Sequence, residues 1–208
     1  KPSEIFTLKQ DFDAETLVKT LKDAGFKKLI VTAKHHDGFC IWDSEHTEYD
    51  VAASGYKDAN GKSDILAEIS KACTDQNMDM GLYLSPWDIH DESYGYYDEN
   101  HKPTDKEHDH LDYNEYYDNQ LKEILGNEKY GNKGHFVEVW MDGAKGNGAN
   151  AQEYDFKRWF NTIQENEGIK AGYDADCMLF GAEAYTTVRW IGNELGIAGK
   201  DTWSKSTV

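Results

Sequence analysis

Apolar residues recur along this chain in two kinds of spacing that alternate with each other. Four segments place them three or four residues apart, as on one face of a helix: residues 14–24, 65–73, 112–129 and 156–163. Four shorter segments are nearly continuous apolar runs, as in buried strands: residues 28–33, 80–85, 136–141 and 176–181. Helix and strand therefore alternate four times with no hairpin signal. This order is typical of an α/β protein with a parallel sheet, either open or closed into a barrel.

Residues that start and stop helices and strands lie at the ends of these segments. Asp13 is placed to cap the first helix, and Gly25 to end it. Either Ser63 or Asp64 caps the second helix, and Pro86 stops the second strand because proline has no backbone N–H to donate. No low-complexity tract or linker interrupts the 208 residues, so we expect a single domain.

The third strand ends on a carboxylate. The run from His135 to Ala144 is rich in strand-forming residues, and Asp142 stands where the strand becomes a loop. In parallel α/β folds, ligands bind at the carboxyl ends of the strands. Gly143 lets the backbone turn away there and keeps space clear. The alternative is that Asp142 is an ordinary loop residue that caps the next segment.

Polar residues also follow the other predicted strands. The first strand leads into Lys34–Asp37, the second into Trp87 and Asp88, and the region after the fourth holds Arg189 and Glu194. Because the carboxyl ends of parallel strands meet at one mouth, we expect these groups to converge with Asp142.

The net charge narrows the range of partners. Asp and Glu outnumber Lys and Arg by 39 to 22, which gives a formal charge of −17. Such a field repels phosphate backbones, acidic substrates and anionic membranes, so we expect no nucleic-acid or membrane partner. Aromatic residues make up 13 % of the chain, which suits either a large core or a site for sugar rings.

Metal and thiol chemistry are not indicated. Cys40, Cys73 and Cys177 are an odd number without C-x-x-C spacing, and the last two read as small core residues. His35 and His36 are good ligand types, but neighbours on an extended strand point to opposite faces unless the strand is kinked. We therefore expect no metal and no other cofactor.

A pair of carboxylates is the remaining catalytic pattern. Glycoside hydrolysis uses one ionised acid at the anomeric centre and one protonated acid at the leaving oxygen. Asp142 at a strand end and Glu194 in a glycine-flanked loop fit these two parts. The alternative for Glu194 is a surface or capping glutamate.

At these residues the sequence resembles the α-L-fucosidases of glycoside hydrolase family 29, and in particular their α-1,3/1,4-specific branch. Four stretches match in the family's order: Leu29–Trp42 (LIVTAKHHDGFCIW), Gly81–Asp88 (GLYLSPWD), Val137–Ala144 (VEVWMDGA) and Arg189–Glu194 (RWIGNE). The resemblance implies a (β/α)8 TIM-like barrel, which usually takes about 250 residues. We therefore expect residues 1–208 to be part of one catalytic barrel domain, incomplete here, with neighbouring strands upstream of residue 1 and downstream of residue 208.

The resemblance also implies roles for single residues. Asp142 matches the family's nucleophile, which forms a covalent fucosyl–enzyme intermediate in a retaining, metal-free double displacement. Glu194 matches the general acid/base. Residues 184–188 depart from the family pattern, so Glu183 is the reserve candidate for the acid.

Residues expected to bind the sugar follow from the same resemblance. The histidines match a pair that binds fucose hydroxyls, and the aromatic residues match the walls of the fucose pocket. The set is His35, His36, Trp42, Tyr83, Trp140 and, as a weaker match, Arg189. The alternatives are a core position for Tyr83 or Trp140, a supporting position for one histidine, and an ion pair with Asp201 or another carboxylate for Arg189.

Three functions are consistent with these patterns. The first is an exo-acting α-L-fucosidase that removes terminal α-1,3/1,4-linked fucose from glycans or oligosaccharides. The others are a non-catalytic fucose-binding module and a metal-dependent barrel hydrolase. Because fucosylated glycans lie outside the cytoplasm, we expect a secreted or extracytoplasmic protein.

Overall fold

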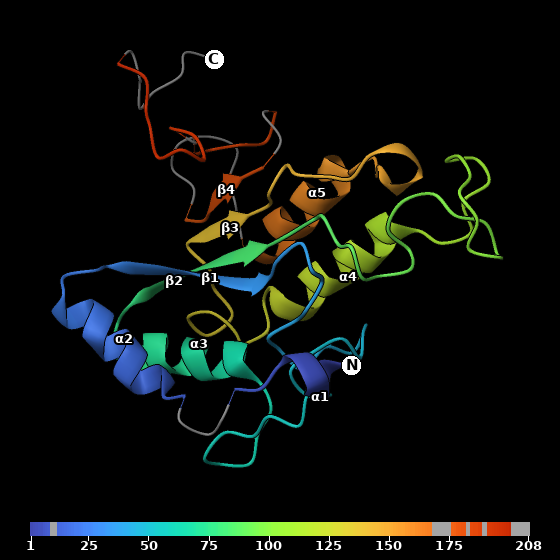
Figure 1. The fold of residues 1–208 in the computed structure, drawn as a ribbon. Coiled ribbons are helices and arrows are strands. Elements are labelled where there is room, and N and C mark those ends of the chain that lie inside the picture. Colours follow the sequence, from blue (N-terminus) through green and yellow to red (C-terminus); the bar gives the residue numbers. More distant parts are fainter. Residues whose placement is uncertain (9–11, 168–175, 182–183, 189–190, 201–208) are drawn as a thin grey trace.

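A parallel sheet with helices on one side forms the framework of the molecule (Figure 1). The computed structural model describes residues 1–8, 12–167, 176–181, 184–188 and 191–200. In chain order the elements are α1 (Pro2–Ile5), α2 (Ala14–Asp23), β1 (Lys28–Lys34), α3 (Ile65–Asp75), β2 (Asp79–Leu84), α4 (Tyr113–Ile124), β3 (Glu138–Trp140), the 3₁₀-helix η1 (Gly148–Asn150), α5 (Phe156–Glu167) and β4 (Met178–Phe180).

The four strands lie side by side in the order in which they occur along the chain. Strand β1 pairs with β2, β2 with β3, and β3 with β4, all in parallel. The register places Tyr83, Trp140 and Phe180 opposite one another across three strands. Because the strands are parallel, their carboxyl ends all lie at the same edge of the sheet.

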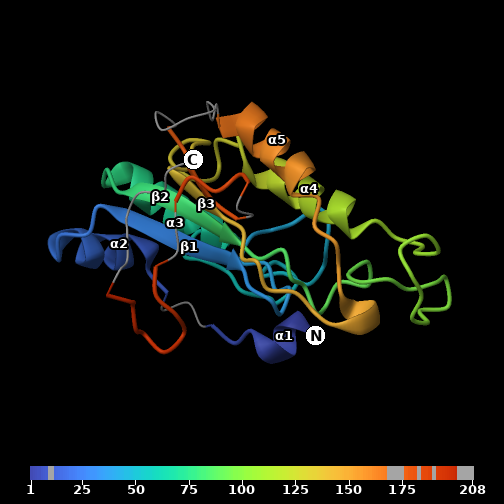
Figure 2. The same ribbon diagram turned by 90° about the horizontal axis from the view of Figure 1, so that it is seen from above.

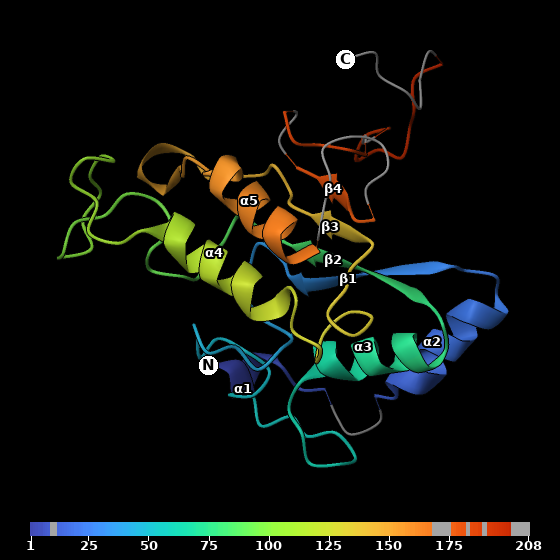
Figure 3. The same cartoon turned by 180° about the vertical axis from the view of Figure 1, so that it is seen from behind.

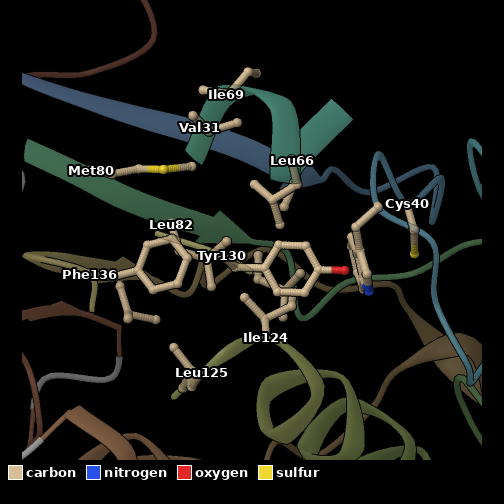
Figure 4. Packing of buried hydrophobic residues seen from close by; sticks show 14 of the residues in the cluster. Val31, Cys40, Leu66, Ile69, Met80, Leu82, Ile124, Leu125, Tyr130 and Phe136 are labelled. Atoms are coloured by element: carbon tan, nitrogen blue, oxygen red, sulfur yellow. The ribbon is translucent and has the colours of Figure 1, made fainter. Parts of the chain in front are cut away.

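Helices α2 to α5 lie together on one face of the sheet, and their apolar residues join those of the strands in one core (Figures 1 and 2). Val31 and Leu82 from the strands meet Leu66 from α3 and Ile124 from α4 within this core (Figure 4). The three cysteines are free and buried, which confirms the core positions predicted for Cys73 and Cys177. The helix layer thus packs against one face of the sheet and holds the strands in place.

The other face of the sheet carries the remaining set of alternating side chains. In β1 the side chains of Ile30 and Thr32 are exposed, whereas Val31 and Ala33 are buried. By the same alternation Glu138, Trp140 and Asp142 share this second face. It is therefore the face on which a ligand can reach the strand ends.

The structure confirms the predicted capping signals at the starts of α2 and α3. Asp13 caps α2 by accepting from the Thr16 N–H, and Asp64, rather than Ser63, caps α3 by accepting from the Ala67 N–H. The prediction for the third helix was too long, since α4 ends at Ile124 instead of continuing to residue 129. Leu125 is extended (φ −73°, ψ 136°) and Gly126 follows in the left-handed region (φ 72°), which ends the helix.

Candidate functional site

The end of β1 brings two imidazoles together. The pairing register shifts between Thr32 and Lys34, and the chain then turns so that the Gly38 N–H donates to the His35 carbonyl (3.0 Å). Gly38 has φ 80°, which favours glycine. The rings of His35 and His36 lie with their centroids 4.0 Å apart. The chain is thus kinked after β1, and this kink allows the neighbouring side chains of His35 and His36 to lie on the same side.

Asp142 lies two residues beyond the end of β3 and is held by two donors. The Tyr83 hydroxyl donates to Oδ2 (2.9 Å), and the Ala144 N–H donates to Oδ1 (2.9 Å). Burial, and then the bond to Asp142, raise the pKa of Tyr83 well above its ordinary value. Tyr83 therefore remains a proton donor, and the two bonds fix the orientation of the carboxylate. A Cβ on Gly143 would meet open space, so that glycine does keep room beside Asp142.

Aromatic rings connect the carboxylate with the imidazoles. The Tyr83 ring stacks on His35 (centroids 5.7 Å apart) and lies 5.8 Å from the ring of Trp140. Trp140 in turn stacks on Phe180 at 3.9 Å, and its indole N–H donates to Glu138 (2.8 Å). The result is a continuous surface across β1 to β4 with Asp142 in it.

His36 lies slightly deeper than His35. Its Nδ1 is 2.7 Å from the Ser85 hydroxyl, and its ring lies 4.9 Å from the ring of Trp87. Burial, and then the neighbouring His35, lower the pKa of His36 below its ordinary value of 6.5, while Asp142 and Asp37 oppose that shift. His36 is therefore neutral near pH 7 and can exchange hydrogen bonds with a sugar hydroxyl.

Two residues predicted at the mouth lie behind it instead. Lys34 is completely buried, with its ammonium 3.1 Å from Asp88 and 2.8 Å from Gln120. Its place among the polar residues at the mouth was wrong, because the register shift turns it into the helix layer. Asp88 was also misplaced, since only 1 % of its surface is exposed.

Asp88 nevertheless holds the loop after β2 in place at the mouth. Its Oδ1 accepts from the N–H groups of His90 and Asp91, both at 2.9 Å. A Cβ on Gly38 would lie 2.3 Å from the same oxygen, so only glycine fits against it. The Lys34–Asp88 pair thus ties the turn after β1 to the loop after β2.

Trp42 does not match its prediction as a wall of the fucose pocket. Its side chain is completely buried within the core, and its indole N–H donates to Glu123 of α4 (2.8 Å). A side chain with no exposed surface has no face to offer a sugar. The match of residues 29–42 to the family therefore indicates a structural role for the tryptophan at this position.

Glu194, predicted after the fourth strand, is not part of this cluster. Glu194 lies on the exposed segment 191–200, whose local hydrogen bonds are turns around Asn193, and which runs away from the sheet (Figures 1 and 3). Within the described ranges it forms no hydrogen bond or ion pair with Asp142. Arg189 and Glu183 lie outside the described residues.

Trp87, which the sequence predicted at the mouth, does lie beside His36. Three other neighbours of the site were not singled out from the sequence: Ser85, Glu138 and Phe180. Ser85 could have been found, because alternation places it two residues beyond Tyr83 on the same face. Phe180 could not, since its contact with Trp140 depends on strand register.

A cavity of about 630 Å³ lies on the rim beside this cluster, where α4 and α5 begin. Tyr154 lines it and donates to the Ala144 carbonyl (2.6 Å), two residues beyond Asp142. No group of three or more His, Cys, Asp or Glu residues in the described part of the chain is arranged to hold a metal ion. No described helix is long and apolar enough to cross a membrane.

Fold and site together define a class: a parallel α/β protein with a carboxylate, two imidazoles and flat aromatic walls at its strand ends. A profile of the family described as "Alpha-L-fucosidase" matches residues 3–187. The chain belongs to this family, glycoside hydrolase family 29, and its parallel sheet with helices is part of that family's α/β barrel.

Individual relatives agree with this assignment. The chain is 42 % identical over 192 residues to α-L-fucosidase 1 of Arabidopsis thaliana, which covers 92 % of this chain and 32 % of that protein. It is 86 % identical to a Ruminococcus gnavus GH29 fucosidase solved in complex with fucose (TM-score 0.92, 100 % of this chain and 41 % of that chain). A crystal structure described as a putative α-L-fucosidase, from Bacteroides ovatus, is 38 % identical (TM-score 0.71, 95 % and 29 %). The chain thus spans about a third of the length of the curated relatives it matches.

Proposed function

We propose that the protein is a retaining exo-α-L-fucosidase that hydrolyses terminal α-1,3/1,4-linked L-fucose through a covalent fucosyl–enzyme intermediate. The observation that carries the proposal is the bond between the Tyr83 hydroxyl and Asp142, because it joins the carboxylate to the aromatic surface that also bears His35. The R. gnavus relative supports the substrate class, since structures of it and of an aspartate-to-alanine variant both contain fucose.

In this mechanism Asp142 attacks the anomeric carbon and the glycosidic oxygen leaves with a proton. Glu194 supplies that proton and then removes one from the attacking water, with Glu183 as the reserve candidate. The imidazoles of His35 and His36 bind the sugar hydroxyls. Tyr83 and Trp140 offer apolar faces to the ring and to its C6 methyl group, while Arg189 contributes a further polar contact.

The retaining outcome requires a defined separation of the two acids. We expect the carboxylates of Asp142 and Glu194 to stand about 5–5.5 Å apart in the substrate complex. The segment that carries Glu194 must therefore lie over the strand ends when substrate is bound. The first-formed anomer of fucose, observed by NMR, distinguishes retention from inversion.

Substitution of the nucleophile is the direct test. Asp142→Ala is expected to remove nearly all turnover of an aryl fucoside and to leave L-fucose binding measurable by calorimetry. Glu194→Ala is expected to slow poor leaving groups more than activated aryl fucosides, because only the former need the proton. Wild-type kcat in the Asp142 variant would rule out the assignment, and equal loss on both substrates would point to Glu183.

The same measurements decide between this proposal and a non-catalytic fucose-binding module. A module binds L-fucose but releases none from the aryl fucoside, even as the wild-type protein. A metal-dependent hydrolase, in contrast, loses turnover on addition of a chelator. Fucosylated glycans as substrates imply that the protein acts outside the cytoplasm.

A further inference from the structure

Ser85 is the first residue after β2 and is completely buried beneath the imidazole pair. Its N–H donates to the Lys34 carbonyl (2.9 Å), which fixes its backbone to the end of β1. Its hydroxyl bonds with the Trp87 carbonyl at 2.8 Å and with Nδ1 of His36 at 2.7 Å, and it also interacts with the Tyr83 hydroxyl. The hydroxyl is thus held between a backbone group and a ring predicted to bind sugar.

The directions of these two bonds follow from the donors available. A serine hydroxyl carries one proton, and a carbonyl oxygen can only accept. The Tyr83 hydroxyl gives its own proton to Asp142, so toward Ser85 it too can only accept. The proton of Ser85 is directed at the Trp87 carbonyl, and Ser85 must therefore accept from His36. Nδ1 of His36 then bears the ring proton, and Nε2 of the neutral ring is left with a lone pair.

We propose that Ser85 is a positioning residue that holds His36 in the Nδ1–H tautomer, so that Nε2 accepts a hydrogen bond from a fucose hydroxyl. The binding part of this inference rests on the proposed function, whereas the tautomer does not. The lowered pKa of His36 is consistent with a neutral ring, with His35, Asp37 and Asp142 as the titratable groups that act on it. The site therefore selects sugars that carry a hydroxyl able to donate a hydrogen bond to Nε2 of His36.

NMR of protein labelled with ¹⁵N-histidine tests the tautomer directly. Long-range ¹H–¹⁵N correlations distinguish a protonated Nδ1 from a protonated Nε2, and the His36 signals are identified by their loss in His36→Gln. The wild type is expected to show Nδ1–H, and Ser85→Ala to shift the ring toward Nε2–H. An Nε2–H ring in the wild type overturns the proposal without any need for the Ser85 variant to fold.

Binding of L-fucose supplies the second readout. Loss of one hydrogen bond is expected to raise the Kd about tenfold in Ser85→Ala. Ser70→Ala is the matched control, because Ser70 is also buried and donates to a backbone carbonyl, that of Leu66 in α3. It is expected to change neither the tautomer nor the Kd, and Ser85→Thr, which keeps the hydroxyl, is expected to restore both.

The outcomes separate the two proposals. An unchanged tautomer or an unchanged Kd in Ser85→Ala overturns the role of Ser85. A wild-type protein that shows Nδ1–H but binds no L-fucose overturns the proposed function and the binding part of this inference, while the tautomer assignment stands.

Discussion

Single residues at the site combine more than one contact, and Tyr83 is the clearest case. Its ring stacks on His35 and its hydroxyl donates to Asp142. Tyr83→Phe removes only the hydroxyl, so the aromatic surface is kept. Because a hydrogen bond to a charged group contributes about 1.5–3 kcal/mol, kcat/KM on an aryl fucoside is expected to fall about 10- to 100-fold.

A second buried tyrosine gives the control for this variant. The hydroxyl of Tyr56 donates to Glu68 in the helix layer (2.9 Å), outside the site. Tyr56→Phe is expected to leave kcat/KM unchanged, with the thermal midpoint measured for both proteins. Equal activity of Tyr83→Phe and the wild type would show that the bond to Asp142 does not support the reaction.

His36 is expected to make stability depend on pH. Its pKa is lower in the folded protein than in the unfolded chain, because of burial first and His35 second, so the unfolded chain takes up the proton more readily. The contribution of neutral His36 is complete above about pH 6.5 and is lost as the pH falls through that value toward the lower folded pKa.

Urea unfolding at pH 7.5 and 5.5 measures this effect. His36→Gln cannot bind the proton, so its midpoint is expected to fall less than that of the wild type over this interval. His35, Asp37 and Asp142 remain in both proteins and serve as the common background. An equal fall of the urea midpoint in the two proteins would assign the pH dependence of stability to other groups.

At the level of elements, the buried Lys34–Asp88 pair joins the ends of β1 and β2. Lys34→Met leaves Asp88 without its cation in a buried place, which is expected to lower the free energy of unfolding by about 3–5 kcal/mol. Lys34→Met combined with Asp88→Asn is expected to recover much of this loss, because asparagine keeps an oxygen for the His90 and Asp91 N–H groups.

Urea titration of these variants at low temperature tests the idea. Lys19→Met is the matched control, since Lys19 also pairs with a carboxylate, Asp23, but both side chains are exposed. Its midpoint is expected to stay at the wild-type value. A double variant less stable than Lys34→Met alone would show that the charges themselves stabilise the fold.

At the scale of the whole molecule, the net charge of −17 opposes compaction. Salt screens repulsion between exposed carboxylates over about 10 Å at 0.1 M. The thermal midpoint is therefore expected to rise from about 10 mM to about 0.2 M NaCl and then to level off. Choline chloride should give the same curve, and a midpoint that falls with either salt would contradict the argument.

The sequence predicted those features that depend on neighbours along the chain. The alternation of helix and strand, the caps at Asp13 and Asp64, and Asp142 at the end of β3 are set by local patterns, and the structure has them. The pairing of His35 with His36 was not predictable in the same way, because it needs the register shift in β1.

Positions that depend on distant elements were missed. Trp42 is buried because Glu123 of α4, far along the chain, accepts from its indole. Lys34 is buried because Gln120 of the same helix and Asp88 receive its ammonium. A sequence motif shows which residue type a position requires, but it does not show whether that side chain faces the mouth or the core. Trp42 and Lys34 therefore match the family stretch although both side chains lie in the core.

The register shift in β1 has a consequence for how the protein loses its shape. Within three residues it sends Lys34 into the interior and the two imidazoles to the outside, with Gly38 fitted against Asp88. Assembly of the interior and assembly of the sugar-facing surface are then one cooperative event. A loosely ordered, still compact form of this chain would keep its helices and have no recognition surface to present, so affinity for ligand should vanish together with tight packing as denaturant is added.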